Sequence, residues 1–181
     1  MSNINQYKML PILKFVPQFK SVLWGGKRIA SYKGLPSQGE NIGESWELSC
    51  VPGHESVVAE GSLKGKNLHE IMLTDAKEIL GERLLKRYGT EFPLLIKLID
   101  SADDLSIQVH PDDTLAAKRH HCPGKTEMWV SIAPADGAYL YSGFNRVISA
   151  EEYRSRIADN TIVDTLGKYY PQKGDVFFLP A

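Results

Sequence analysis

The feature that most constrains the fold is a two-residue hydrophobic period that dominates the chain after residue 90. Successive side chains of an extended backbone point to opposite faces, so this period predicts β-strands. Many short strands separated by turn residues favour a β-sandwich or barrel, because no regular strand–helix alternation is present to build a doubly wound sheet. The predicted strands cover residues 92–99, 105–109, 126–132, 137–141 and 176–179.

Helical patterns interrupt these strands. Asn67 is a plausible N-cap with Glu70 three residues later, and apolar residues recur at helical spacing over 67–89, where Gly81 is expected to divide two helices. Two shorter helices are predicted at 112–120 and 149–158.

A further pair of strands is predicted before residue 60. Residues 44–49 and 55–59 are short and β-rich, and Pro52-Gly53 separates them as in a hairpin. The chain has 43% apolar residues and no linker-like tract, so we expect one domain over 1–181 with a helical insertion at about 67–89.

Charge and hydropathy exclude several classes of partner. The net charge is -1 and basic residues form no block, so neither nucleic acid nor an anionic membrane is expected. The longest apolar run, 92–99, contains Lys97 and is far shorter than the roughly 20 residues of a spanning helix. The polar first residues resemble no secretion signal, and Cys50 and Cys122 are too few for a disulfide framework, so a cytoplasmic location is predicted.

Two of the predicted strands carry metal-capable side chains. Extended geometry places Ser106, Gln108 and His110 on one face, and the same geometry groups Lys125, Glu127 and Trp129. If both strands line one pocket, an amide oxygen, an imidazole and a carboxylate meet there, and zinc accepts such donors. The spacing alone fits a half-solvated antiparallel strand equally well.

Lys97 places a charge inside an apolar run. A buried ammonium requires an anion, whereas an outward-facing lysine can extend to water over its apolar stem. Both alternatives remain open from the residues. His120-His121-Cys122 is expected to be a helix end and turn, since adjacent side chains diverge, and Trp24-Gly25-Gly26 is expected to be a tight turn and not a phosphate loop.

Taken together, the motifs resemble those of the type I mannose-6-phosphate isomerases, a family with a metal-binding cupin fold. The resemblance extends over nearly the whole chain, and the order of the motifs is that of the family. The motifs are Trp24-Gly25-Gly26, Gly43-Glu-Ser-Trp-Glu47, Phe92-Pro-Leu-Leu-Ile-Lys97, Ser106-Ile-Gln-Val-His-Pro111, Lys125-Thr-Glu-Met-Trp129 and Gly174-Asp-Val-Phe-Phe-Leu-Pro-Ala181.

The resemblance implies a fold and a metal site. The expected fold is mainly β, a cupin-type jelly roll with a helical insertion, C-terminally truncated because the family continues into a histidine ligand and a catalytic arginine after the segment that ends here at Ala181. It further implies that Gln108, His110 and Glu127 are ligands of Zn²⁺, with Gln108 the weakest of the three.

The implied reaction interconverts mannose 6-phosphate and fructose 6-phosphate through an enediolate. Lys97, Ser106 and Lys125 are implied to face this sugar phosphate, and Lys125 is also the candidate for the proton shuttle. Two alternatives remain: another metal-dependent cupin enzyme, against which Gln108 and the lysines count, and a non-catalytic sugar-phosphate-binding cupin fragment.

Overall fold

A computed structural model describes residues 10–181 of the chain. The chain divides into two compact units, Met1–Leu105 and Ser106–Ala181, and each is described by itself. Residues 1–9, where the polar start led us to predict no secretion signal, lie outside the described residues.

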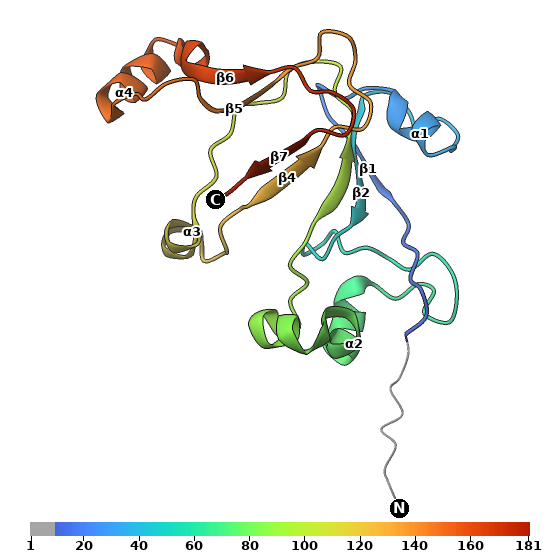
Figure 1. The fold of residues 1–181 in the computed structure, drawn as a ribbon. Helices are drawn as coiled ribbons and strands as arrows, with labels where there is room; N and C mark the ends of the chain where they lie inside the picture. Colours follow the sequence, from blue (N-terminus) through green and yellow to red (C-terminus); the bar gives the residue numbers. More distant parts are fainter. Residues whose placement is uncertain (1–9) are drawn as a thin grey trace, which may run out of the picture. The chain divides into compact units, whose positions relative to one another are not determined.

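The first unit contains a three-stranded antiparallel sheet in the order β1-β2-β3 (Figure 1). Its strands are β1 (Gln18–Ser21), β2 (Ile42–Leu48) and β3 (Ile96–Ile99). The central strand β2 is the longest, and its Trp46 lies opposite Gln18 on one side and Lys97 on the other. This strand confirms the prediction for residues 44–49.

A tight turn and a short helix, α1 (Arg28–Tyr32), lie between β1 and β2. The Gly26 backbone N–H donates to the carbonyl oxygen of Asp100 at 2.8 Å, and the buried Asp100 carboxylate accepts from the Arg28 backbone N–H and from its Nε. A Cβ atom on Gly26 would lie 2.0 Å from Oδ2 of Asp100. The glycine of the Trp-Gly-Gly motif is therefore needed for close packing, and the predicted turn is confirmed.

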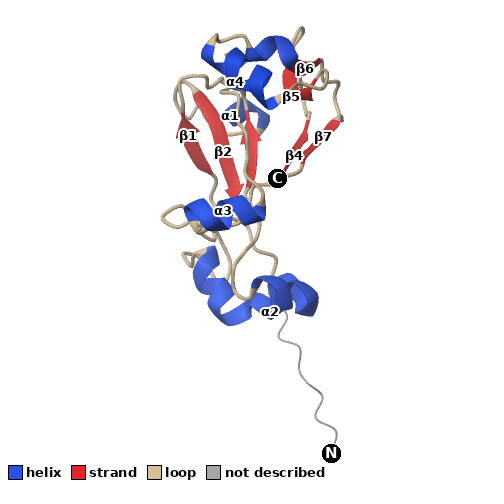
Figure 2. Cartoon of the chain, turned by 90° about the vertical axis from the view of Figure 1, so that its left-hand side faces the viewer, coloured by secondary structure: helices blue, strands red, loops and turns tan. Residues whose placement is uncertain are grey.

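The helix α2 (Leu68–Tyr88) lies at one end of this sheet in both views (Figures 1 and 2). Its capping box is formed as predicted, because Glu70 N donates to Asn67 Oδ1 at 2.8 Å and Asn67 N donates to Glu70 Oε2 at 3.0 Å. Gly81 has φ 70° and interrupts the helix, as predicted, and a second interruption occurs at Asp75.

The apolar core of the first unit forms around the first turns of α2. Leu68, Met72 and Ala76 recur at a spacing of four and are buried, with Met72 completely inaccessible. The side chains that pack against them are Phe15, Leu48, Cys50, Ile79, Leu80, Leu85 and Phe92.

Met72→Ala tests this core. Removing a fully buried side chain and leaving a cavity is expected to lower the free energy of unfolding by about 2–5 kcal/mol. The neighbouring Leu73 is 58% exposed, so Leu73→Ala should change it by no more than about 0.5 kcal/mol. Urea denaturation of both variants measures the difference, and equal effects would contradict the assigned core.

The second unit consists of two small antiparallel sheets, β4–β7 and β5–β6, with helices between the strands (Figures 1 and 2). Asp112 and Ser149 cap the helices α3 and α4, as the sequence predicts. The elements are α3 (Asp113–His120), β4 (Glu127–Val130), β5 (Leu140–Phe144), α4 (Ala150–Ala158), the 3₁₀ helix η1 (Ile162–Thr165), β6 (Leu166–Tyr169) and β7 (Val176–Leu179).

The two faces of the β4–β7 sheet differ in exposure. Met128 lies opposite Phe178 and Val130 opposite Val176, and all four are more than half exposed. The other face carries half-buried side chains, which include Glu127, Trp129 and Phe177. This second face is therefore the protected one, and it contains the polar residues of β4.

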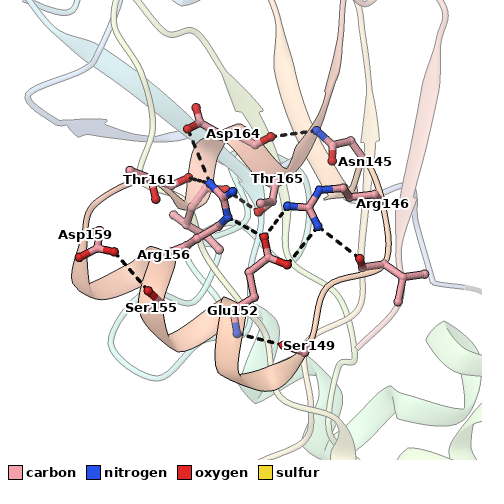
Figure 3. A network of polar contacts seen from close by, with 12 residues as sticks. Asn145, Arg146, Ser149, Glu152, Ser155, Arg156, Asp159, Thr161, Asp164 and Thr165 are labelled. Atoms are coloured by element: carbon pink, nitrogen blue, oxygen red, sulfur yellow. Dashed lines mark hydrogen bonds and ion pairs between the residues drawn. The ribbon is translucent and has the colours of Figure 1, made fainter.

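A polar network joins α4 to the segments on either side of it (Figure 3). The Glu152 carboxylate lies between two guanidinium groups, those of Arg146 and Arg156, and Arg156 also donates to the carbonyl oxygen of Thr161 at 3.3 Å. The hydrogen bonds from Arg146 and Arg156 lower the pKa of the Glu152 carboxyl from its ordinary 4.5 to about 2. Ionised Glu152 thus joins the first turn of α4 to Arg146, which precedes the helix, and to Arg156 within it.

The network predicts a defined pH dependence for the stability of the chain. Because folding depresses the pKa of Glu152, its contribution is complete above about pH 4.5 and is lost as the pH falls from there toward 2. Glu152→Gln is expected to unfold at lower urea concentration than the parent at pH 7, and this gap should narrow below pH 4.5. Glu151→Gln, at an exposed neighbouring position, is the matched control, and a gap as wide at pH 3 as at pH 7 would contradict the assignment.

The expectation of a mainly β, C-terminally truncated jelly roll is met only in part, because the described residues are mixed in secondary structure and form small antiparallel sheets that do not close. The strands form three separate small sheets, and the helices contain more residues than the strands do. A strand forms only where a neighbouring strand satisfies its backbone hydrogen bonds. The strand predicted at residues 92–99 is therefore shortened to β3, and the one predicted at 55–59 makes only isolated bridges. The strand predicted at residues 105–109 does not form.

None of the helices in residues 10–181 combines the length and apolar character that a membrane crossing requires.

Candidate metal centre

Glu127 begins strand β4 and lies at the centre of the polar contacts on its protected face. Its Oε1 is 2.8 Å from Lys125 Nζ, and its Oε2 accepts a hydrogen bond from Trp129 Nε1 at 3.2 Å. Residues 125, 127 and 129 therefore lie on one face, as the strand period predicts, because alternate residues of a strand share a side.

His110 reaches the same carboxylate from a different part of the chain. Its Nε2 lies 3.3 Å from Glu127 Oε2, and both side chains are about four-fifths buried, at 18% and 19% exposed. An imidazole nitrogen and a carboxylate oxygen thus face each other in a partly shielded environment.

Helix α3 and the turn after it bring His110 to Glu127. Lys125 N donates to the carbonyl oxygen of Pro111 at 3.3 Å, and Gly124 N donates to the Asp113 carboxylate at 2.9 Å. A Cβ atom on Gly124 would lie within 2.8 Å of the Pro111–Asp113 backbone, so only glycine permits this approach. The entrance and exit of the α3 segment are thereby joined, although residues 105–109 form no strand.

The surroundings of Glu127 keep it ionised. Burial by itself would raise the pKa of this carboxyl. Hydrogen bonds from Lys125 and Trp129, together with the positive charge of Lys125 and the nearby His110, outweigh burial and hold the pKa below its ordinary value. A carboxylate anion is therefore present at neutral pH.

Ser106 and Gln108 are exposed and contact each other. Gln108 Nε2 donates to Ser106 Oγ at 3.0 Å, which places these two side chains on the same side of the chain, as predicted. This bond uses the amide NH₂ of Gln108 and leaves its carbonyl oxygen, the atom that suits a metal ion, for other partners.

The donors at His110 and Glu127 suit a zinc ion in chemistry and in spacing. Zinc accepts imidazole nitrogen and carboxylate oxygen, and two donors about 2.1 Å from a tetrahedral ion lie about 3.4 Å apart. The observed separation of 3.3 Å agrees with that value. Within residues 10–181, however, no group of three His, Cys, Asp or Glu side chains is suited to hold a metal, and His110 and Glu127 come together as a pair.

Lys97, in the first unit, faces an anion of its own chain. Its Nζ lies 2.7 Å from Glu44 Oε1, and the side chains are 28% and 15% exposed. Trp46 Nε1 donates to the other oxygen of Glu44 at 2.6 Å. Of the two alternatives for this lysine, a partly buried and paired ammonium is the one observed.

Glu44, the partner of Lys97, and Trp46, which contacts the same carboxylate, were not predicted from the sequence. The signal was present, because a lysine inside an apolar run requires an anion, and Glu44-Ser-Trp46 has the same spacing as Glu127-Met-Trp129. The expected helix end at His120 and His121 is confirmed, since His121 has a left-handed backbone with φ 55° and its N–H donates to the Ala117 carbonyl oxygen.

Comparison with known proteins identifies the family. The family model described as phosphomannose isomerase type I, catalytic domain, matches residues 12–138, a range that includes every metal and substrate residue predicted above. The chain belongs to this family.

Individual relatives agree with the family assignment. Mannose-6-phosphate isomerase from Streptococcus mutans is 35% identical over 91% of this chain, and ManA from Bacillus subtilis is 32% identical over 93% of it. A crystal structure of the mannose 6-phosphate isomerase from Bacillus subtilis superimposes with a TM-score of 0.84 at 33% identity and covers 93% of this chain.

These matches cover only part of the isomerase relatives. The chain spans 50% of the Streptococcus protein, 52% of ManA and 52% of the chain in the crystal structure. It is thus homologous to an N-terminal portion of type I phosphomannose isomerases.

The ion pair at Lys97 makes a prediction about stability. Lys97→Met removes the ammonium from a mostly buried carboxylate and is expected to lower the free energy of unfolding by about 1–3 kcal/mol. In the background of Glu44→Gln, Lys97→Met should lower the free energy of unfolding by less, because no partly buried carboxylate is left without its lysine. Lys14→Met, which removes a lysine from an exposed pair with Glu60, should lower the free energy of unfolding clearly less than Lys97→Met does. A larger loss at Lys14 than at Lys97 would contradict the assignment.

Proposed function

We propose that this chain provides zinc and substrate residues of an isomerase that interconverts mannose 6-phosphate and fructose 6-phosphate. The family match and the names of the relatives support the reaction. The observation that carries the zinc site is the approach of His110 Nε2 to Glu127 Oε2 at 3.3 Å.

His110 and Glu127 are the proposed principal ligands, and Gln108 is the third and weakest. When bound, zinc supplies Lewis acidity at the hydroxyl and carbonyl oxygens of the sugar. The chain contributes the orientation of its donors: the α3 segment holds His110 in place, and hydrogen bonds fix both oxygens of Glu127.

Lys97, Ser106 and Lys125 are the proposed contacts of the sugar phosphate. Ammonium groups and a hydroxyl are suitable donors to phosphate oxygens. Lys125 is half exposed, and its ammonium can donate to a ligand while it also contacts Glu127. Ser106 Oγ accepts from Gln108, so its own hydrogen remains free for donation to a phosphate.

Lys125 is also the proposed proton carrier. Isomerisation of an aldose to a ketose moves a proton between C1 and C2 through an enediolate, and the carrier must lie within hydrogen-bond reach of that position. Lys125 Nζ has a carboxylate oxygen at 2.8 Å, which orients the amine beside the metal ligands. Phosphate binding and proton transfer are alternative tasks for this one side chain.

We also infer that the separate sheets contribute to a cupin-type jelly roll. The superposition on the Bacillus subtilis isomerase, of which this chain covers 52%, supports this inference. The half-exposed apolar face of β4 and β7 is typical of strands that a second sheet covers in such folds.

One observation favours a second candidate function. Among the described residues only two strong metal donors come together, which suits binding of a sugar phosphate without catalysis by this chain. Measurement of binding and of turnover on the same sample distinguishes the two functions.

His110→Ala tests the proposed function in the 181-residue chain. Loss of a principal ligand is expected to lower the zinc bound per chain at least about tenfold and to abolish any conversion of mannose 6-phosphate. Bound zinc is measured after gel filtration by elemental analysis, and fructose 6-phosphate by a coupled assay. His120→Ala, which removes an exposed imidazole of the same unit, is the matched control and should keep its zinc.

Two results would contradict the proposal. Equal zinc content in His110→Ala and the parent would refute the metal site, and turnover in metal-free protein would refute zinc dependence. Binding of mannose 6-phosphate without turnover would favour the non-catalytic function.

A further inference from the structure

Trp129 contacts the proposed metal ligand Glu127, although the proposed reaction assigns no role to this tryptophan. Its indole Nε1 donates to Glu127 Oε2 at 3.2 Å, and this is the oxygen that faces His110 Nε2 at 3.3 Å. Lys125 contacts the other oxygen, Oε1. The tryptophan and the histidine therefore meet at one atom of the carboxylate.

The first unit contains a similar arrangement, in which the nearby histidine, His54, contacts the ring of the tryptophan, with the ring centroids 5.4 Å apart. Trp46 Nε1 donates to Glu44 Oε2 at 2.6 Å, and Lys97 Nζ lies 2.7 Å from Glu44 Oε1. A Glu-x-Trp segment on a strand thus places an indole N–H on one carboxylate oxygen and leaves the other to a lysine. This second pair shows what the arrangement does by itself: it orients a carboxylate.

The two partners of Glu127 differ in how firmly they can hold it. The terminal torsion of a glutamate is broad, so hydrogen bonds must select its orientation. Lys125 is 52% exposed and has a flexible four-carbon side chain. Trp129 is half buried, has only two side-chain torsions and lies opposite Phe177 in the β4–β7 ladder. The indole is therefore the more rigid support.

We propose that Trp129 is a positioning residue for the metal carboxylate. Its N–H holds Glu127 Oε2 toward His110 Nε2, so that both donors are set before the ion arrives. This inference rests on the proposed zinc site, because a positioning role has meaning only if Glu127 is a ligand. Partners that orient ligating side chains typically change metal affinity about 10- to 100-fold when they are removed.

Trp129→Phe tests the role, because it retains an aromatic ring and removes only the N–H donor. Zinc affinity is measured in the 181-residue chain by competition with a chelating dye, and the dissociation constant is expected to rise about 10- to 100-fold. Trp46→Phe is the matched control: it removes the same kind of bond from Glu44, which is no proposed metal ligand, and zinc affinity should stay within about twofold of the parent. In the background of Glu127→Ala, Trp129→Phe should have no further effect.

The outcomes separate this inference from the proposed function. If the parent binds no zinc, or if Glu127→Ala binds zinc as the parent does, the proposed metal site fails and the inference fails with it. If Glu127→Ala weakens zinc binding but Trp129→Phe does not, the site stands and only the positioning role is overturned. An equal loss in Trp46→Phe and Trp129→Phe would also overturn it, since a general loss of stability then explains both.

A second measurement does not depend on the folding of Trp129→Phe. The chain contains three tryptophans, so its NMR spectrum has three indole N–H signals, which Trp24→Phe and Trp46→Phe assign by elimination. In metal-free protein Glu127→Ala is expected to move the Trp129 signal upfield, because a hydrogen bond is lost, and to leave the Trp46 signal in place. An unmoved Trp129 signal would overturn the proposal.

Discussion

The candidate site depends on the different contacts that the two oxygens of one carboxylate, that of Glu127, make. Glu127 contacts Lys125 through Oε1, while its Oε2 faces both Trp129 and His110. These contacts keep the group ionised in spite of its burial, since they outweigh the desolvation that raises its pKa. The side chains proposed for metal ligation at His110, and for phosphate binding or proton transfer at Lys125, both contact this carboxylate directly.

The parallel between Glu127 and Glu44 indicates a general property of strand geometry. Residues two apart on a strand share a face, so an indole placed there can reach the carboxylate without any loop. In both places a lysine takes the remaining oxygen. What distinguishes the two places is the group that a histidine contacts: His110 faces the carboxylate of Glu127, whereas His54 contacts the ring of Trp46. The difference in proposed chemistry therefore comes from a residue outside the strand motif.

Local features of the fold were predictable because local physics determines them. The capping box at Asn67, the interruption at Gly81 and the caps at Asp112 and Ser149 occur where the sequence indicates them. Strand pairing was less accessible: residues 105–109 have a strand period but form no ladder, and β1, α1 and β6 carried no period that identified them. The period of two predicted that Lys125, Glu127 and Trp129 share one face. The approach of His110 to Glu127 could not be predicted in this way, because it depends on the backbone hydrogen bond between Lys125 and Pro111, which no periodicity encodes.

The hydrogen bond between Lys125 and Pro111 limits how the sequence around α3 can vary. The backbone contacts of Gly124 and Lys125 with Pro111 and Asp113 close a loop around α3, so the register between the imidazole and the carboxylate is set inside a short closed segment. A residue inserted or deleted within that loop would rotate one end against the other, whereas the exposed tip at Cys122 can change its side chain without altering the closure. Evolutionary drift is therefore expected to exchange the side chain at this exposed tip, to keep the glycine at 124, and to conserve the length of the loop strictly.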